Sequence, residues 1–228
     1  MNPNEKYLGT PLLIGKNKQQ CFTHLQEKVK NRLSIWGGST LSQCGKSQMI
    51  KTVTNTIPTY TMRCLQIHVE VVNNINALQR DFWWGFDEKK GTYSISWKYL
   101  KRHKDIGGQG FRDLRILNQA LLIRAAWRIC TNSDALWVKC MSAKYFPYTS
   151  MLHASKKNVC SWAWKGVQKN IEFIKQHNCW RFGSGDHIKI WIDVWIIGMD
   201  SPPIPKQEVV DSENFVWVKD LFMPNARQ

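Results

Sequence analysis

Closely spaced cations beside tryptophans, between residues 83 and 112, are the side chains of this sequence best suited to chemistry. Cations neutralise negative charge and flat aromatic rings stack on bases, so together they suit a nucleic acid. The tryptophans here are Trp83, Trp84 and Trp97, and the cations are Lys98, Lys101, Arg102, Lys104 and Arg112. We predict that these cations contact phosphates. Trp97 stands beside Lys98 and could stack a base, although we favour packing in the core, the more common role of tryptophan in so aromatic a protein.

Further cations occur towards the N-terminus, and we predict that they also contact nucleic acid: Lys16, Lys18, Lys46 and Lys51. Lys46 and Lys51 fall in an expected helix, where we place them on the outward face. The sequence Gly45-Lys46-Ser47 imitates the end of a phosphate-binding P-loop. That motif requires a glycine five residues before Gly45, and Thr40 occupies the position. We therefore expect no nucleotide cofactor.

Histidine, cysteine and aspartate side chains form no recognisable catalytic or metal site. His177, Cys179 and His187 occur close together, but a structural zinc site usually needs four ligands in two tight pairs. Asp186 and Asp193 form a carboxylate pair on paper, yet they suit turn and strand-end positions better. No local signature orients a cysteine or histidine for nucleophilic attack. We therefore predict no metal, no cofactor, no small-molecule substrate and no catalytic residue.

The composition favours a globular protein with a polyanionic partner. The formal net charge is +15, 43% of residues are hydrophobic and twelve are tryptophan. Such a chain can bury enough apolar surface to fold, and its charge favours nucleic acid, although a membrane surface or a ribosome would attract it as well. The N-terminus lacks a secretory signal, and no apolar run approaches the ~18 residues of a membrane span. We expect an intracellular protein, nuclear or cytoplasmic, without a membrane partner.

Apolar spacing predicts a mainly α fold, a helical bundle with an N-terminal β arm and a C-terminal β-hairpin. Apolar residues recur every three or four positions, as on one face of a helix, in the stretches 22–36, 41–57, 68–84, 114–129, 136–146 and 161–174. Residues 7–12 have an extended pattern typical of a strand arm. The expected hairpin pairs Trp180–Phe182 with Ile188–Ile192 around the glycine turn at 183–186.

The cationic stretch leads through a glycine turn into a helix. Gly107, Gly108 and Gly110 can supply the turn, and Gly110 permits backbone conformations that other residues avoid. Asp113 stands where a helix cap is needed. Its carboxylate can accept hydrogen bonds from the free amides of the first turn and favours the positive end of the helix dipole.

Several ordered motifs resemble plant LINE-type non-LTR retroelement reverse transcriptases. They are FWWG at 82–85, SW at 96–97, GGQGFRD at 107–113, N-x-A-L-L at 118–122, AWRI at 126–129 and AKYFP at 143–147. The similarity runs from Tyr7 to about Trp195, with Gln109 where the family usually has leucine and Val194 where it usually has proline. The resembled part lies downstream of the polymerase active site. It comprises the thumb and the connection towards the reverse-transcriptase zinc-binding segment.

The resemblance implies three segments. Residues 1–18 would be a remnant of the palm and primer-grip strand region, 19–147 a helical thumb and connection-like domain, and 148–228 a helix plus β-hairpin with an irregular tail. The family's catalytic carboxylates lie upstream of its YLG motif, which here begins at Tyr7, and the sequence holds no adjacent aspartate pair. The family's zinc ligands would follow the last residue. Because polymerisation needs paired carboxylates that hold two metal ions, we expect this chain to be inert as an RNA-directed DNA polymerase.

Three functions remain open from the sequence. The leading one is a truncated reverse-transcriptase-like protein whose basic helices bind the backbone of RNA, DNA or a hybrid without sequence preference. The second is a decayed retroelement fragment that acts only as a structural or interaction piece and keeps its charge by inheritance. The third is an enzyme whose site is not visible in the sequence.

Overall fold

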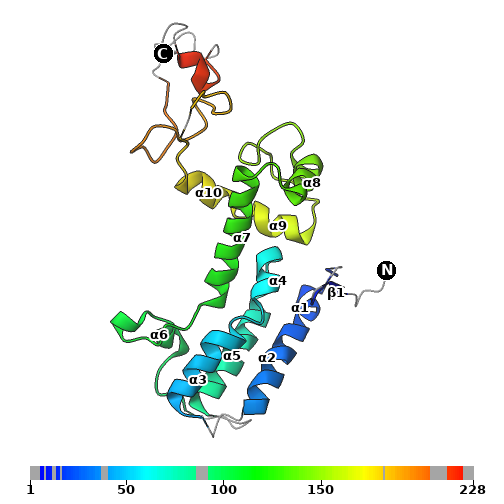
Figure 1. Cartoon of the computed structure of the whole chain (residues 1–228), viewed down its shortest axis with the longest axis vertical. Coiled ribbons are helices and arrows are strands. Elements are labelled where there is room, and N and C mark those ends of the chain that lie inside the picture. The colour runs from blue at the N-terminus through cyan, green and yellow to red at the C-terminus, as the bar shows by residue number, and fades with distance from the viewer. Residues whose placement is uncertain are drawn as a thin grey trace. The chain divides into compact units, whose positions relative to one another are not determined.

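The computed structural model describes residues 6–7, 9–11, 14–15, 17–36, 41–85, 92–181, 183–205 and 215–222. Lys16, one of the predicted cations, lies outside these ranges. The chain is mainly helical, as the sequence predicts (Figure 1). It forms two compact units, the first from residues 1–128 and 156–168 and the second from 129–155 and 169–228. The three expected segments are consecutive in sequence whereas the units are interleaved, and the origin of the segments stays a prediction.

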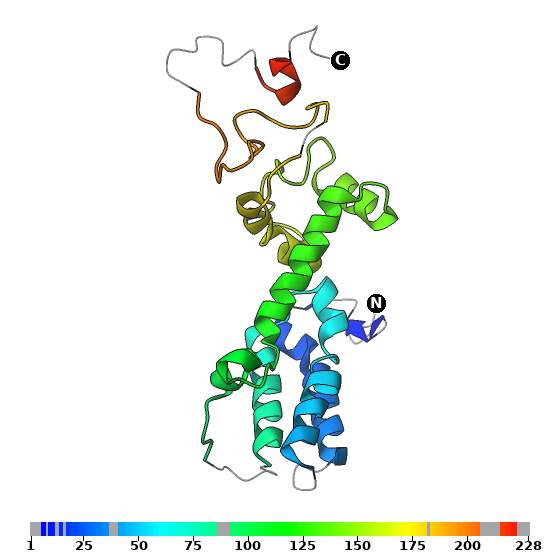
Figure 2. The ribbon, with the colours of Figure 1, turned by 60° about the vertical axis from the view of Figure 1, so that its left-hand side comes forward.

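Three helices pack side by side in the first unit: α2 (Thr23–Trp36), α3 (Gln43–Met49) and α5 (Val69–Trp84), as Figures 1 and 2 show. The short helices α1 (Lys18–Cys21) and α4 (Thr59–Cys64) flank them. Their common core consists of fully buried side chains, among them Phe22, Val29, Ile50, Met62 and Ile75. The predicted helices at 22–36 and 68–84 are confirmed. α5 ends where Gly85 adopts a left-handed conformation with φ of 76°, which suits glycine because it has no Cβ.

The helix expected over 41–57 is wrong in detail. α3 continues into a wider π-helical turn, η1 (Ile50–Thr54), and the chain then turns before α4. Lys46 is only 6% exposed, the reverse of its predicted outward orientation. The cause is helical phase, because Lys46 stands one turn before Ile50 and therefore shares the face that Ile50 buries.

Two buried amide side chains connect elements of the first unit. Gln79 on α5 donates to Thr54 Oγ1 at 2.9 Å and to Asn55 Oδ1 at 3.0 Å. Asn118 on α7 (Leu114–Thr131) binds backbone atoms of α4 and of the segment that follows it. It accepts from the Ile67 amide at 2.9 Å and donates to the carbonyls of Met62 and Leu65. These bonds fix α7 against that segment, since a buried backbone group without a partner is costly.

The helix expected over 161–174 is two helices. α9 (Trp162–Gln168) belongs to the first unit and α10 (Ile171–His177) to the second. Ser161 caps α9, because its Oγ accepts from the Trp164 amide at 3.2 Å. The Trp162 indole N–H donates to the Gln66 carbonyl at 2.9 Å, which anchors α9 within the first unit.

The second unit contains α8 (Leu136–Tyr145), α10 and the 3-10 turn η3 (Val218–Leu221), and it lacks the expected hairpin within its described residues. Ile188 and Ile190 instead exchange backbone bonds with Val218 and Val216, around an isolated antiparallel bridge between Lys189 and Trp217. The second predicted strand stops because the amides of Ile192 and Asp193 both fold back onto the Lys189 carbonyl. The predicted helix that ends before Pro147 is confirmed by α8.

The N-terminal arm is present as a minimal antiparallel pair. β1 (Lys6–Tyr7) pairs with β2 (Thr10–Pro11), and Gly9 between them has a φ of 80°. No helix in the described ranges is both long and apolar enough to span a bilayer.

Candidate nucleic-acid interface

A tight glycine turn positions the predicted cations of the central stretch. The turn follows α6 (Trp97–Leu100) and the 3-10 turn η2 (Lys104–Ile106). The amides of Gly108 and Gly110 donate to the carbonyls of His103 and Arg102, at 3.0 and 2.8 Å. A Cβ added at Gly108 would lie 2.1 Å from the Arg102 carbonyl oxygen, so the approach requires glycine. Gly110, with a φ of 67°, takes the special conformation that the sequence predicts for it.

Trp97 packs on the core, which is the role we favour for it. Its ring stacks on Phe111 with centroids 5.0 Å apart and an interplanar angle of 25°, and Trp83 meets Phe111 edge-on at 5.3 Å. Phe111 itself is buried. The face of Trp97 that meets Phe111 is therefore not open to a base.

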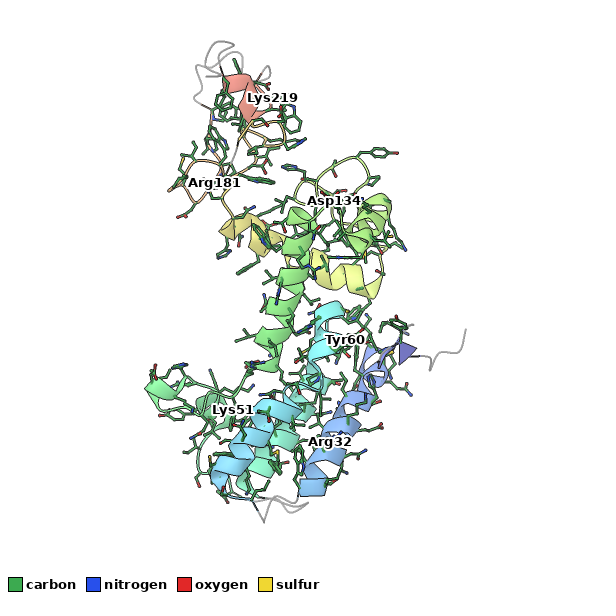
Figure 3. The ribbon with its side chains drawn as sticks, viewed as in Figure 1. Arg32, Lys51, Tyr60, Asp134, Arg181 and Lys219 are labelled. Carbon is green, nitrogen blue, oxygen red and sulfur yellow. The ribbon has the colours of Figure 1, made fainter. Side chains whose placement is uncertain are left out.

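Lys51 is distant in sequence from the central stretch, but its side chain lies beside Phe111. Its Nζ lies 5.7 Å from the centroid of the Phe111 ring, and Figure 3 shows it on the side of the helices that faces α6. Burial lowers the pKa of Lys51, and the positive charge of Lys104 lowers it further, while Cys44 acts in the opposite direction. Lys51 and Lys104 are thus close enough to repel each other.

Lys101 is held within the protein. Its Nζ lies 3.1 Å from Asp113 Oδ2, and its side chain is only 15% exposed. Asp113 also caps α7 as predicted, because Oδ1 accepts from the amides of Arg115 and Ile116 at 2.9 and 3.5 Å. Burial acts to raise the pKa of Asp113, but the hydrogen bonds from Lys101 and from the backbone outweigh it, and the pKa lies below its usual value. The positive charge of Lys101 is therefore largely neutralised by Asp113.

The other predicted cations divide by their surroundings. Lys98, Arg102, Lys104 and Arg112 are exposed, and with Lys51 we call them the α6 basic surface. Lys18 is half-buried and its Nζ lies 4.3 Å from the centroid of the Trp162 ring, in a cation–π contact. Lys46 is buried. Of the cations predicted from the sequence, four are therefore exposed on this stretch, and the half-buried Lys51 approaches them beside Phe111.

The comparisons with known proteins identify relatives in a plant. No family model matches the chain. It is 34% identical over 151 residues to the uncharacterized mitochondrial protein AtMg00310 of Arabidopsis thaliana, and the alignment covers 65% of this chain and 97% of that protein. The chain belongs to the family of this mitochondrial protein.

A second relative is much longer than this chain. The chain is 27% identical over 220 residues to the Putative ribonuclease H protein At1g65750 of Arabidopsis thaliana, across 94% of this chain and 35% of that one. The chain thus spans about a third of this relative. Relatives of these two kinds are typical of retroelement-derived reading frames of plants, which agrees with the broad part of the resemblance in the sequence.

Sequence reasoning missed an aromatic ring beside the basic surface and two exposed cations on α7. Tyr99 is 37% exposed, and the Arg102 guanidinium lies 5.0 Å from its ring centroid. Arg115 and Arg124 are exposed on α7. The signal was present, because both arginines fall between the apolar positions that mark the buried face of this helix.

The histidine, cysteine and aspartate residues that occur close together in the sequence do not form a common site in the structure. Within the ranges that the structure covers, no three side chains of histidine, cysteine, aspartate or glutamate are grouped as a metal site would require. His177 bonds through Nδ1 to the Phe173 carbonyl at 2.9 Å. Asp186 pairs with Lys219 at 3.5 Å, whereas Asp193 is buried and bonds to His153, so the two aspartates do not form a pair.

Proposed function

We propose that this chain is a reverse-transcriptase-like fragment of LINE-type retroelement origin, equivalent to a thumb and connection region, that binds nucleic-acid backbone through the α6 basic surface. The observation that supports this most is the position of Lys51, whose Nζ lies over the Phe111 ring and whose pKa is lowered by burial and by the nearby positive charge of Lys104. Like charges held together without a bound anion are unfavourable. A phosphate placed between them would relieve that repulsion.

The binding is electrostatic and independent of sequence. Five cations that each neutralise one phosphate would give a slope of log affinity against log salt of roughly 3.5 to 4.5, from about 0.7 to 0.9 per contact. Trp97 contributes packing, because one of its faces lies on Phe111. The partner of the α6 basic surface is RNA, DNA or their hybrid, and this surface takes neither a membrane nor a small-molecule substrate.

This chain does not polymerise by itself. Two-metal phosphoryl transfer requires paired carboxylates, and the sequence contains no adjacent aspartate pair. The relative named as a ribonuclease H protein is far longer than this chain, which spans about a third of it. Assignment of residues 148–228 to a segment that leads to a zinc-binding region rests on the resemblance alone.

Salt-dependent binding tests the proposal. Fluorescence anisotropy of a labelled mixed-sequence duplex and a labelled single strand is measured over a range of KCl for the wild type and for Lys98→Gln/Arg102→Gln/Lys104→Gln. The triple variant should flatten the slope by roughly two to three units and weaken all sequences alike. A matched control, Lys28→Gln/Lys30→Gln/Arg32→Gln, removes the same charge from exposed positions on α2.

The control variant separates local contacts from the effect of net charge. It should retain most of the slope, because long-range attraction is screened over about 10 Å at 0.1 M salt. An unchanged slope in the triple variant of the α6 basic surface would mean that this surface does not bind nucleic acid. The decayed fragment without a binding role would then be the better description.

A further inference from the structure

Three side chains of the second unit form a continuous hydrogen-bonded chain. Ser150 Oγ lies 2.8 Å from His153 Nδ1, and His153 Nε2 lies 2.9 and 3.1 Å from the two carboxylate oxygens of Asp193. A serine hydroxyl, an imidazole and a carboxylate in this order are the groups that activate a serine as a nucleophile. Asp193 is distant in sequence from the other two residues, which is why no local signature indicates the arrangement.

The carboxylate determines which imidazole nitrogen carries the proton. Ionised Asp193 only accepts hydrogen bonds, so Nε2 of His153 is the donor and Nδ1 is left with a lone pair that accepts the Ser150 hydroxyl. The side chains of His153 and Asp193 are 10% and 6% exposed. Asp193 Oδ2 also accepts from the Lys189 amide at 2.8 Å. The imidazole is therefore held in the orientation and tautomer that a general base for Ser150 requires.

Ser150 opens onto a cavity with apolar walls. The cavity has a volume of about 550 Å³ and is lined by Ser150 together with Val138, Phe146, Met151, Leu152 and Trp180. A space of this size and lining accepts a small acyl or aromatic group. His153 and Asp193 line a second, smaller and more polar cavity of about 230 Å³, beside Glu172 and Lys175. The nucleophile thus faces the apolar space and the base faces a polar one.

We propose that Ser150, His153 and Asp193 form an acyl-transfer site that hydrolyses small apolar esters. This activity is separate from nucleic-acid binding, because all three residues and both cavities belong to the second unit whereas the α6 basic surface belongs to the first. His153 exchanges protons with Ser150, the leaving alcohol and water, and Asp193 acts through His153. The apolar cavity holds the acyl group.

The reaction has two balanced halves. In the first, Ser150 Oγ forms a bond to the ester carbonyl carbon while its proton passes to His153 Nδ1, and Asp193 stabilises the imidazolium. The bond between the carbonyl carbon and the alcohol oxygen then breaks, and the leaving alcohol takes the proton from His153. In the second half, water gives its proton to His153 and attacks the acyl-serine. The acid is released as Ser150 regains the proton.

A purely structural role for the three residues makes different predictions. In that role the hydrogen bonds only tie the turn at 150–153 to the turn at 189–193, and an exposed serine would react no faster than any other. Covalent labelling decides between the two, because an activated serine attacks a fluorophosphonate whereas an ordinary serine does not. Labelling requires only the first attack of the serine, so it does not depend on release of the product.

The experiment uses the full chain and an alkyl fluorophosphonate, with intact mass and peptide mapping as readouts. Ser133 lines the same cavity and is exposed, but it has no contact with His153, so Ser133→Ala is the matched control for Ser150→Ala. We expect one label on Ser150 in the wild type and in Ser133→Ala, and none in Ser150→Ala. Release of p-nitrophenol from p-nitrophenyl butyrate should fall at least tenfold in Ser150→Ala.

A second variant tests the role of His153 as the general base. His153→Gln keeps a polar side chain, and circular dichroism establishes whether it is folded. If it is folded, it should label at least tenfold more slowly than the wild type. The proposal is overturned if the wild type is labelled no faster than denatured protein, or if Ser150→Ala is labelled and hydrolyses the ester as the wild type does. The chain of hydrogen bonds is then a structural link.

Discussion

Lys101 Nζ and Asp113 Oδ2 lie 3.1 Å apart, and the same aspartate caps α7. One carboxylate thus joins the end of α6 to the start of the next helix, across the glycine turn. Because Asp113 satisfies both an ammonium group and first-turn amides, its loss removes two kinds of interaction together. This pairing also explains why a cation of the central stretch is absent from the α6 basic surface.

Asp113→Asn should destabilise the protein by roughly 1 kcal/mol at neutral pH, because the amide oxygen can still cap α7 but the negative charge that binds Lys101 is lost. The pKa of Asp113 is depressed below its ordinary value of 3.8, so the stabilisation is present above that pH and is lost as the pH falls through the lower folded-state value. Urea denaturation at pH 7 and near pH 3 measures it. The difference between wild type and variant should shrink in acid.

Asp134→Asn is the control for that variant. Asp134 is 96% exposed, and its oxygen lies 3.9 Å from Lys139 Nζ, so the ion pair contributes little. Its replacement should leave the denaturation midpoint nearly unchanged at both pH values. Equal effects of the two variants would mean that the Lys101–Asp113 pair has no special role.

Gly108→Ala should destabilise the first unit by roughly 2–4 kcal/mol, because the new Cβ would lie 2.1 Å from the Arg102 carbonyl oxygen and force the backbone to move. Movement of this turn displaces Arg102 and Lys104, so the salt slope of nucleic-acid binding should fall as well. Thermal denaturation and anisotropy titrations measure the two effects. Gly15→Ala meets no atom within 4 Å and serves as the control. A Gly108→Ala protein as stable as the control would contradict the close approach.

Trp97→Ala should cost roughly 2–4 kcal/mol, because the ring packs on Phe111 and the residue is partly buried. Trp97→Phe keeps an aromatic ring and should recover much of that loss. Urea denaturation followed by circular dichroism measures both, since the substitution alters tryptophan fluorescence. If Trp97→Ala is as stable as the wild type and binds only single strands more weakly, then the ring stacks on bases instead.

Local features of the chain were predictable. α2, α5 and α7 follow from apolar residues one helical turn apart, and the ends of these helices follow from single residues such as Gly85 and Asp113. Such signals act between neighbours in the sequence, so nothing distant has to be known. The helical class of the fold follows from them directly.

The tertiary structure was needed to decide which helix face is buried and which segments pair with each other. The apolar pattern of the 41–57 stretch places Ile50 in the core, but whether the lysine one turn before it is covered depends on the neighbouring elements, and Lys46 is buried. Ile188 and Ile190 alternate as a strand does, but alternation does not name a partner. The neighbouring residues 180–182 were expected, and residues 216–218 took that place.

The composition of the α6 basic surface was likewise predictable only in part. The sequence indicated basic residues near Trp97, since they are adjacent in the chain, and it favoured packing for that tryptophan. It could not show that Asp113 binds Lys101, or that Lys51 reaches Phe111 and approaches Lys104. Coulomb energy depends on distance in space. Which of the many cations act together is therefore decided by packing between helices, whereas the number of cations is decided by the sequence.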